Sequence, residues 1–596
     1  MNVIWKYLKE YFGRISLGML IKFLGTLGEL SLPYILEHII DNIVPVGSLR
    51  LVLIWGMGMI FMAFLTRQLN VTANRMAVAV SKRAIFNLRH DLFAKTAHLS
   101  GSRFDNFGLP SLTSRMTSDT YNVQNFMTRM QTIGIRGPIM LIGGIALTMT
   151  MDVYLSSLLC IMVPLLLIVV LSISKKGVPL YGKVQKCVDN IVRIMRENIT
   201  GIRVIKALSK ESHEKERYAQ ANEDLTSIDI HASVIMAIPG SFMQLCLNTG
   251  LTLVVILGAY RVNSGAIQPG VILAFLTYFN LILQSVMGLN RIFVMYSKAK
   301  ASADRIGLVL VDKPDQLVLT DEEARRSIQP YEPAYDHDDP SLHIIFDHVS
   351  FMYHTDEELE TTQEEKDDRD YSLSDVSFSV KKGESLGIIG STGCGKTTII
   401  NLLMRFYDAD KGQIFVDGKD VRTYEFDDLR SKFGVVFQND IIFADTLMNN
   451  IDFGRGLTPE EVDTAADHGM AKPFIDNLEQ GYDHTAAIKG ADFSGGQKQR
   501  LMISRALAAH PKILILDDSS SALDYKTDAA LRSAIKEHYA GTTTIMVAQR
   551  VSSIMNLNHI LVVENGKILA SGTHKELLDN CNLYRTIYES QMGALA

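Results

Sequence analysis

The fold of this chain is decided by the stretch Gly390-Ser391-Thr392-Gly393-Cys394-Gly395-Lys396-Thr397. It matches the pattern G-x-x-x-x-G-K-[ST] at every fixed position. An apolar run at 385–389 precedes the stretch and a helical run at 398–403 follows it, so the motif has the strand–loop–helix context that it requires. Glycines let backbone N–H groups close around phosphate oxygens, and the start of a helix favours negative charge. We therefore predict an α/β domain that binds ATP through Gly390–Thr397 and Thr398, with Lys396 on the outer phosphates and Thr397 on Mg²⁺.

A second apolar run, 513–516, ends in two acidic residues, Asp517 and Asp518. A carboxylate at the end of a buried strand beside a phosphate loop is suited to coordinate the Mg²⁺ of a bound nucleotide. We assign this metal role to Asp517. The residue after it, Asp518, is expected to polarise the attacking water.

The motif Phe493-Ser494-Gly495-Gly496-Gln497 resembles the signature of ATP-binding cassette (ABC) proteins, normally LSGGQ. Other landmarks of that family fall in the expected order. The resemblance implies that Tyr353 stacks on adenine, that Gln438 reaches toward Mg²⁺ and links the site to a membrane domain, and that Ser521-Ala522-Leu523-Asp524 forms the D-loop. It also implies that a partner chain's ATP is bound by Ser494, Gly495, Gly496, Gln497 and Asp524.

The first half of the chain contains apolar runs long enough to span a membrane. A spanning helix needs about 20 mostly uncharged residues. Three uninterrupted runs lack Asp, Glu, Lys and Arg, and shorter apolar cores accompany them. We predict six spanning helices, at about 16–42, 50–70, 132–151, 155–174, 235–260 and 271–295.

Composition separates the two halves. Of 596 residues, 47% are hydrophobic and 21% charged, which excludes a disordered chain. Residues 1–310 carry 31 Lys and Arg against 17 Asp and Glu, whereas residues 311–596 carry 28 against 48. Because the basic residues lie among apolar runs, we expect no nucleic-acid partner. The cysteines at 160, 187, 246, 394 and 581 are too scattered for a metal site or a disulfide framework, and the N-terminus shows no secretory signal peptide.

Positive charges predict the orientation of the membrane half. Lys and Arg concentrate in 67–136 and 175–217, which should be cytoplasmic together with both termini. Turn residues are scarce in these segments, so we expect the helices to project far beyond the bilayer. They should end in short turns near Phe107–Ser114 and Ala207–Glu211. The nearby stretches 114–119 and 201–207 resemble the intracellular-loop sequences of ABC exporters, which implies that the turns dock on the cassettes, the second on the partner chain's.

The predicted fold is a membrane α-helical domain of six transmembrane helices with long cytoplasmic extensions, followed by an α/β P-loop cassette. Its expected bounds are 1–310 for the membrane domain, 311–342 for a linker and 343–596 for the nucleotide-binding domain. This order resembles a half-transporter of the ABC exporter superfamily. The resemblance favours a bacterial inner or plasma membrane, cofactors ATP and Mg²⁺, and a small amphipathic substrate such as a drug, lipid or peptide.

Three positions depart from the family pattern. Asp518 stands where a Glu is usual, and Gln549 stands where the family has its switch histidine. Asp is shorter by about one C–C bond, roughly 1.5 Å, and Gln has no acid–base function. Ile488 stands where a Glu is common, which puts coupling through that loop in doubt.

Paired cassettes bind ATP between one chain's phosphate loop and the other chain's signature. The departures predict a degenerate site on this chain, involving Asp518, Gln549 and Gln438, whereas the intact signature should complete a partner's site. This pattern resembles one subunit of a heterodimeric exporter, with a second, non-identical half-transporter as partner. Two alternatives stay open: a homodimeric lipid or peptide exporter with slow sites, and a non-hydrolysing regulatory or receptor subunit.

Two further features carry weaker hypotheses. Glu29 lies within the first spanning segment, where a charge is costly. It either lines the transport cavity and favours cationic substrates, or pairs with a neighbouring polar group. The acidic segment His354–Asp370 is either a solvated surface loop or a contact to the partner cassette that regulates exchange at the adenine site.

Overall fold

The structure, a computed structural model, describes residues 2–326, 332–353, 371–438, 441–519 and 522–592. It divides into two compact units. The first unit is Met1–His98 with Leu109–Asp312, and the second is Leu99–Gly108 with Lys313–Ala596. A short segment from the first half of the sequence therefore folds as part of the second unit.

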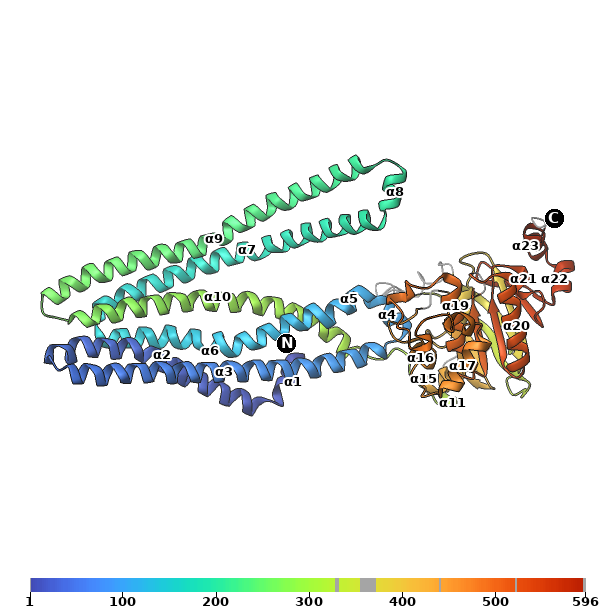
Figure 1. The fold of residues 1–596 in the computed structure, drawn as a ribbon, viewed down its shortest axis with the longest axis horizontal. Coiled ribbons are helices and arrows are strands. Elements are labelled where there is room, and N and C mark those ends of the chain that lie inside the picture. The colour runs from blue at the N-terminus through green and yellow to red at the C-terminus, as the bar shows by residue number, and fades with distance from the viewer. Residues whose placement is uncertain (1, 327–331, 354–370, 439–440, 520–521, 593–596) are drawn as a thin grey trace. The chain divides into compact units, whose positions relative to one another are not determined.

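The first unit is built from long helices (Figure 1). Six of its helical segments are long and apolar enough to cross a membrane, which confirms the predicted number. Its helices are α1 (Asn2–Lys9), α2 (Phe12–His38), α3 (Leu49–Ala97), α5 (Leu109–Ser114), α6 (Thr120–Met151), α7 (Val153–Thr200), α8 (Ile202–Ala207), α9 (Glu211–Asn263) and α10 (Pro269–Val311), with π-helical turns at Ile39–Ile43 and Arg115–Asp119.

Several of these helices exceed the thickness of a bilayer. α3, α7 and α9 contain 49, 48 and 53 residues. At 1.5 Å per residue each is longer than about 70 Å, against a hydrocarbon core of about 30 Å. α7 and α9 run side by side and are joined through α8, as Figure 1 shows. The predicted projecting extensions are therefore present as continuous helix.

The first turn begins earlier than predicted, although a break does fall within 107–114. α3 ends at Ala97, and the short helix α4 (Gly101–Phe107) follows. The Ser100 side chain caps α4 by accepting a hydrogen bond from the Arg103 N–H, at 3.2 Å. Gly108, at φ 71°, ends α4, so the residues after it are free to start α5. The second turn lies at α8 and the residues before Glu211, as expected.

Two charged side chains inside the helix bundle, Glu29 and Lys22, have polar partners. Arg136 donates two hydrogen bonds to the Glu29 carboxylate, at 3.0 and 2.5 Å. The structure therefore favours pairing of Glu29 over the hypothesis of a free anionic group for cationic substrates. Lys22, nearly fully buried, donates to the side-chain oxygens of Asn70 and Asn74.

The second unit contains two sheets. One has the strand order β2-β1-β4-β5 and is antiparallel; the other has the order β10-β9-β3-β8-β7-β6, with β9, β3, β8, β7 and β6 parallel. The strands are β1 (Leu342–Phe351), β2 (Leu373–Lys381), β3 (Ser385–Gly390), β4 (Lys411–Val416), β5 (Lys419–Asp420), β6 (Phe433–Val436), β7 (Ile513–Asp517), β8 (Thr543–Val547), β9 (His559–Glu564) and β10 (Lys567–Gly572).

Helices complete this unit and cover the parallel sheet. The central strands β3, β7 and β8 are almost entirely buried, as near-continuous Val, Ile and Leu runs of a parallel sheet should be. The helices are α4, α11 (Asp321–Arg326), α14 (Lys396–Leu403), α15 (Phe426–Arg430), α16 (Leu447–Asp452), α17 (Pro459–His468), α18 (Lys472–Ile475), α19 (Gly495–Leu507), α20 (Tyr525–His538), α21 (Val551–Ile554), α22 (His574–Asn580) and α23 (Asn582–Met592).

Candidate nucleotide-binding site

One edge of the parallel sheet gathers the predicted site residues. β3, β8 and β7 are neighbours in the sheet, and β6 lies beside β7. Their carboxyl ends carry the phosphate loop, Gln549, Asp517 and Gln438 respectively. Ligands of open parallel sheets bind outside this edge. The arrangement therefore places these residues where a nucleotide is expected.

Two glycines shape the phosphate loop. Gly393 and Gly395 have φ of 83° and 106°, which favours glycine because a side chain is strained there. A Cβ on Gly395 would also lie 2.8 Å from the Ser372 carbonyl oxygen. The loop delivers the chain into α14, whose first residue, Lys396, donates to the carbonyl oxygens of Gly390 and Ser391 at 2.9 and 2.7 Å. The ammonium is thereby held inside the loop.

Thr397 and Asp517 form an oxygen pair suited to Mg²⁺. The Thr397 hydroxyl donates to a carboxylate oxygen of Asp517 at 3.3 Å. Asp517 is 2% exposed, and burial raises the pKa of its carboxyl. Among the described residues no cluster of three or more His, Cys, Asp or Glu could hold a metal. Mg²⁺ in nucleotide sites takes one or two protein ligands and completes its shell with phosphates and water, so Thr397 and Asp517 are the residues that would hold it through their side-chain oxygens.

Asp518 is engaged by Gln549. The Gln549 side-chain N–H donates to Asp518 Oδ2 at 2.9 Å, and the Asp518 backbone N–H donates to the Val547 carbonyl. Asp518 has φ 50°, a backbone conformation that few non-glycine residues adopt. Burial raises the pKa of its carboxyl, opposed by the charge of Lys396. The residue expected to polarise water is thus hydrogen-bonded to a neutral amide.

Tyr353 stands where it can offer a ring face to a base. Its side chain is 43% exposed. Its hydroxyl lies 3.3 Å from Thr398 Oγ1 and accepts a hydrogen bond from Asn401 Nδ2, also at 3.3 Å. These contacts fix the ring over the first turn of α14.

The signature motif starts a helix of its own. Ser494 caps α19 by accepting from the Gln497 N–H, while the Gln497 side chain accepts from the Ser494 N–H, which makes a capping box. A Cβ on Gly496 would lie 3.0 Å from the Ala522 carbonyl oxygen, so the signature approaches the D-loop closely. In that loop Asp524 caps α20 through Thr527.

Two further residues singled out in the sequence, Gln438 and Ile488, have exposed side chains. Gln438 follows β6 and is exposed, and its neighbours Asn439 and Asp440 lie outside the described residues, as do Ser521 and the acidic segment 354–370. Ile488 is 76% exposed, and nothing in the structure explains it.

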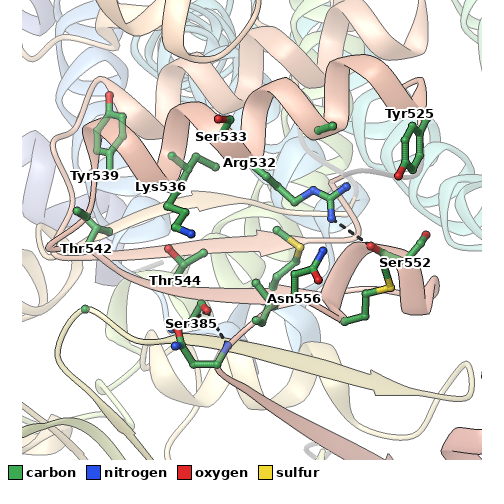
Figure 2. Close-up of a pocket in the computed structure, with 18 residues that line it drawn as sticks. Ser385, Tyr525, Arg532, Ser533, Lys536, Tyr539, Thr542, Thr544, Ser552 and Asn556 are labelled. Atoms are coloured by element: carbon green, nitrogen blue, oxygen red, sulfur yellow. Dashed lines mark hydrogen bonds between the residues drawn. The ribbon is translucent and has the colours of Figure 1, made fainter. Parts of the chain in front are cut away.

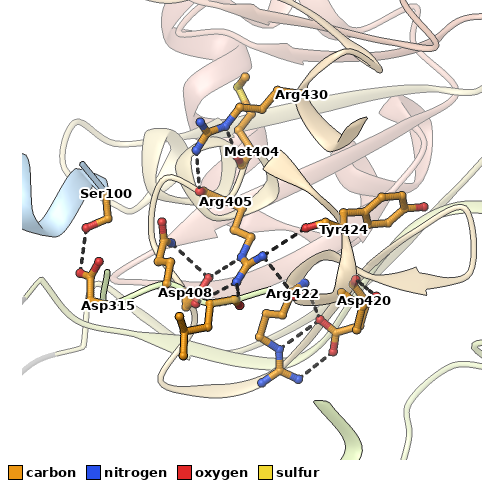
Figure 3. Close-up of polar contacts among 12 residues, drawn as sticks. Ser100, Asp315, Met404, Arg405, Asp408, Asp420, Arg422, Tyr424 and Arg430 are labelled. Atoms are coloured by element: carbon orange, nitrogen blue, oxygen red, sulfur yellow. Dashed lines mark hydrogen bonds and ion pairs between the residues drawn. The ribbon is translucent and has the colours of Figure 1, made fainter. Parts of the chain in front are cut away.

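Sequence analysis missed a polar network beside the phosphate-loop helix (Figure 3). Arg405, which directly follows α14, is fully buried. Its guanidinium donates to Asp408 at 2.9 Å and to the carbonyl oxygens of Leu317 and Arg422 at 2.6 and 3.1 Å. Arg405 thereby ties the segment after α10 to the cassette. The only signal in the sequence was a charged residue closing an apolar helix.

A separate pocket of about 620 Å³ lies between α20 and strands β3 and β8. Figure 2 shows Lys536 of α20 and Tyr539, the residue after that helix, on one side and Ser385 and Asn556 on the other. The predicted nucleotide-site residues do not line it.

Comparisons with known proteins agree with this architecture. The family model described as "ABC transporter transmembrane region" matches residues 15–286, and the model "ABC transporter" matches 373–521. The "Uncharacterized ABC transporter ATP-binding protein YfiB" of Bacillus subtilis is 34% identical over 98% of each chain. The corresponding protein Rv1273c of Mycobacterium tuberculosis is 30% identical over 98% of this chain and 97% of its own.

A solved structure has the same fold over almost the whole chain. It is described as "Structure of a bacterial Atm1-family ABC exporter with ATP bound", with a TM-score of 0.78 and 25% identity over 97% of this chain and 99% of that one. Both halves of the sequence and their order are thus accounted for by one kind of protein. The chain belongs to the ABC transporter family, as a half-transporter whose N-terminal membrane domain is fused to an ATP-binding cassette.

Proposed function

We propose that this chain is the degenerate-site subunit of a heterodimeric ABC exporter. ATP binding closes the paired cassettes, the long helices transmit the closure, and a cavity that holds an amphipathic compound turns outward by alternating access. Both termini and the cassette lie in the cytoplasm, and the six helices cross the cell membrane. The observation that carries this proposal is the hydrogen bond of 2.9 Å between Gln549 and Asp518.

This contact explains why the chain's own site should hydrolyse slowly. The Asp518 carboxylate is set back by roughly 1.5 Å relative to a Glu, and displacements of that size cost catalysts about a hundredfold. Gln549 occupies one of its oxygens and offers no proton-transfer group. ATP binding depends instead on Lys396 and the loop, which are unaltered.

The signature side supports a hydrolytic site on the partner. The signature begins α19, and a helix N-terminus favours anions, so the Gly495 and Gly496 N–H groups, which lie between the two capped donors of Ser494 and Gln497, are the ones proposed to hold a γ-phosphate. A non-identical partner with Glu and His at the positions of Asp518 and Gln549 would then hydrolyse ATP at the site that this signature completes.

The first test is the Mg²⁺-ATPase activity of this chain purified alone in nanodiscs. Lys396→Ala serves as the blank, and ATP binding by the wild-type chain serves as the folding control. We expect binding with negligible turnover. Substantial turnover that Lys396→Ala abolishes would overturn the heterodimer proposal, because a homodimer would then work with Asp518 and Gln549.

A second candidate is a regulatory subunit whose nucleotides act only as ligands. The same Asp518–Gln549 contact favours it, since a site that holds ATP without cleaving it can serve as a sensor. ATP-driven flux of an amphipathic compound into sealed vesicles, by the complex with its partner, separates the two. Flux supports the exporter, and its absence despite ATP binding supports the regulatory subunit.

An ion pair in the membrane domain bears on the charge of the substrate that we propose. Because Glu29 is neutralised by Arg136, the pair offers no net negative charge to attract cations. An amphipathic compound, rather than specifically a cation, is therefore the substrate class that we propose.

A further inference from the structure

Tyr407 lies between the adenine-binding ring and α4. Its ring meets that of Tyr353 edge-on, with the centroids 5.1 Å apart and an angle of 85° between the planes. Phe351 packs against both rings, at 4.9 Å from Tyr353 and 5.5 Å from Tyr407. Three aromatic rings thus form one contact group, in which the Tyr353 side chain is partly exposed.

The other end of Tyr407 is held by α4. Its hydroxyl donates a hydrogen bond to the carboxylate of Asp105. Burial and this carboxylate both raise the pKa of the Tyr407 phenol, so it stays protonated and remains a donor at neutral pH. The bond joins residues 302 positions apart in the sequence.

α4 is fitted closely to the residue pair Phe406 and Tyr407. The Gly101 N–H donates to the Phe406 carbonyl oxygen at 3.0 Å. A Cβ on Gly101 would lie 2.8 Å from both that oxygen and the Tyr407 ring. Only glycine allows this approach, so α4 cannot shift at this point without disturbing Tyr407.

The contact between α4 and Tyr407 matters because of where α4 lies in the chain. α4 belongs to the second unit, yet it is joined by a few residues to α3 and directly to α5 of the first unit. Ser100, at the start of α4, also donates to Asp315 at 2.8 Å (Figure 3), and Asp315 lies in the segment that follows α10. Both covalent routes from the membrane helices therefore reach the cassette beside Tyr407.

We propose that Tyr407 is a positioning residue that couples base stacking on Tyr353 to the position of α4 through its hydrogen bond to Asp105. The inference rests on the proposed function only in taking Tyr353 as the adenine-stacking residue. When α4 holds the hydroxyl, Tyr407 supports the Tyr353 ring edge-on. When that bond is lost, Tyr353 loses a fixed neighbour and stacks less well.

The size of the effect follows from the ring contact. An edge-to-face neighbour stabilises an aromatic ring beyond the area that it buries, so losing the support of Tyr353 should weaken ATP binding by roughly three- to tenfold. Coupling is reciprocal, so a bound base should in turn steady α4. Inorganic tripolyphosphate has no base, so its binding affinity should change neither when Tyr353 loses its support nor when α4 moves.

The experiment is a double-mutant cycle on the full chain in nanodiscs. ATP and tripolyphosphate affinities are measured by competition with a fluorescent ATP analogue in the wild type, Tyr407→Phe, Asp105→Ala and the double variant. We expect each single variant to bind ATP three- to tenfold more weakly, the double to match the singles, and tripolyphosphate to bind unchanged throughout. Tyr424→Phe is the matched control, because its hydroxyl donates to the Val416 carbonyl within the cassette.

The outcomes separate this inference from the proposed function. Unchanged ATP affinity in Asp105→Ala, additive losses in the double variant, or equal losses for tripolyphosphate would each overturn the role of Tyr407. If Lys396→Ala still bound ATP, the assignment of the nucleotide site itself would be wrong. If the wild-type chain bound ATP but drove no flux, only the proposal that it is an exporter would be refuted. Asp105→Asn should retain most of the affinity, because an amide oxygen still accepts the hydroxyl.

Discussion

The sharpest prediction concerns the pair Asp518 and Gln549. Replacing both, as Asp518→Glu with Gln549→His, should restore hydrolysis at this chain's own site. Glu extends the carboxylate by roughly 1.5 Å toward the nucleotide, and active sites lose about a hundredfold for a misplacement of about 1 Å. A hundredfold gain corresponds to about 2.7 kcal/mol of transition-state stabilisation.

The existing hydrogen bond predicts how the two changes combine. Gln549 donates to Asp518 at 2.9 Å, so each single variant changes one member of a contacting pair and leaves the other unmatched to it. Contacting residues are coupled by about 0.5–3 kcal/mol. The rate of phosphate release should therefore rise less than tenfold in each single variant. In the double variant it should rise by more than the product of the two single increases.

The assay is phosphate release by this chain in nanodiscs at saturating Mg²⁺ and ATP, with Lys396→Ala in each background as the blank. The melting temperature and ATP affinity of each variant control for folding. If the double variant folds and binds ATP but releases phosphate no faster than wild type, the explanation of the slow site is refuted. The same measurement with the partner present then tests whether total turnover rises.

Other predictions address the rest of the molecule. Arg405→Met should destabilise the cassette by roughly 3 kcal/mol or more, measured by urea unfolding, because Asp408 and two backbone carbonyls lose a buried donor. Gly101→Ala should lower ATP-driven flux more than it lowers the melting temperature, since its Cβ would clash with the cassette at 2.8 Å. Glu29→Gln should reduce thermal stability in nanodiscs by leaving Arg136 unpaired, and adding Arg136→Gln should recover part of the loss. Because the pKa of Asp517 is raised and Mg²⁺ needs the ionised carboxylate, Mg²⁺ affinity in the presence of ATP should fall as pH drops from neutral, with a slope that flattens in Asp517→Asn.

The fold could be predicted because its signals are local. A glycine loop between a strand and a helix, and apolar runs of spanning length, identify the phosphate-loop domain and six membrane segments without any knowledge of distant contacts. The carboxyl ends of β3, β7 and β8 follow from the same logic, since parallel strands bring their ends to one edge.

What could not be predicted depends on contacts between distant residues. Tyr407 and Asp105 are separated by 302 positions, and Arg136 and Glu29 by 107. Each residue has an ordinary identity, and no periodicity distinguishes it. The early start of the first turn has a different cause, because Ser100 caps a helix of only seven residues, α4, before Gly108 ends it inside the predicted range.

The layout of the cassette bears on the proposal that one chain carries a degenerate half-site together with a functional signature. Asp518 and Gln549 follow neighbouring strands β7 and β8 and satisfy each other through one hydrogen bond, so this pair can differ from the family pattern without leaving an unpaired group. The signature satisfies its own backbone through the Ser494–Gln497 capping box on α19, with no contribution from that pair. The capping box and the Asp518–Gln549 pair have no residue in common, so the proposed degenerate loop and the proposed functional signature are compatible in one folded cassette. We therefore favour a partner of different sequence, because two copies of this chain would pair each signature only with another loop of the proposed degenerate kind.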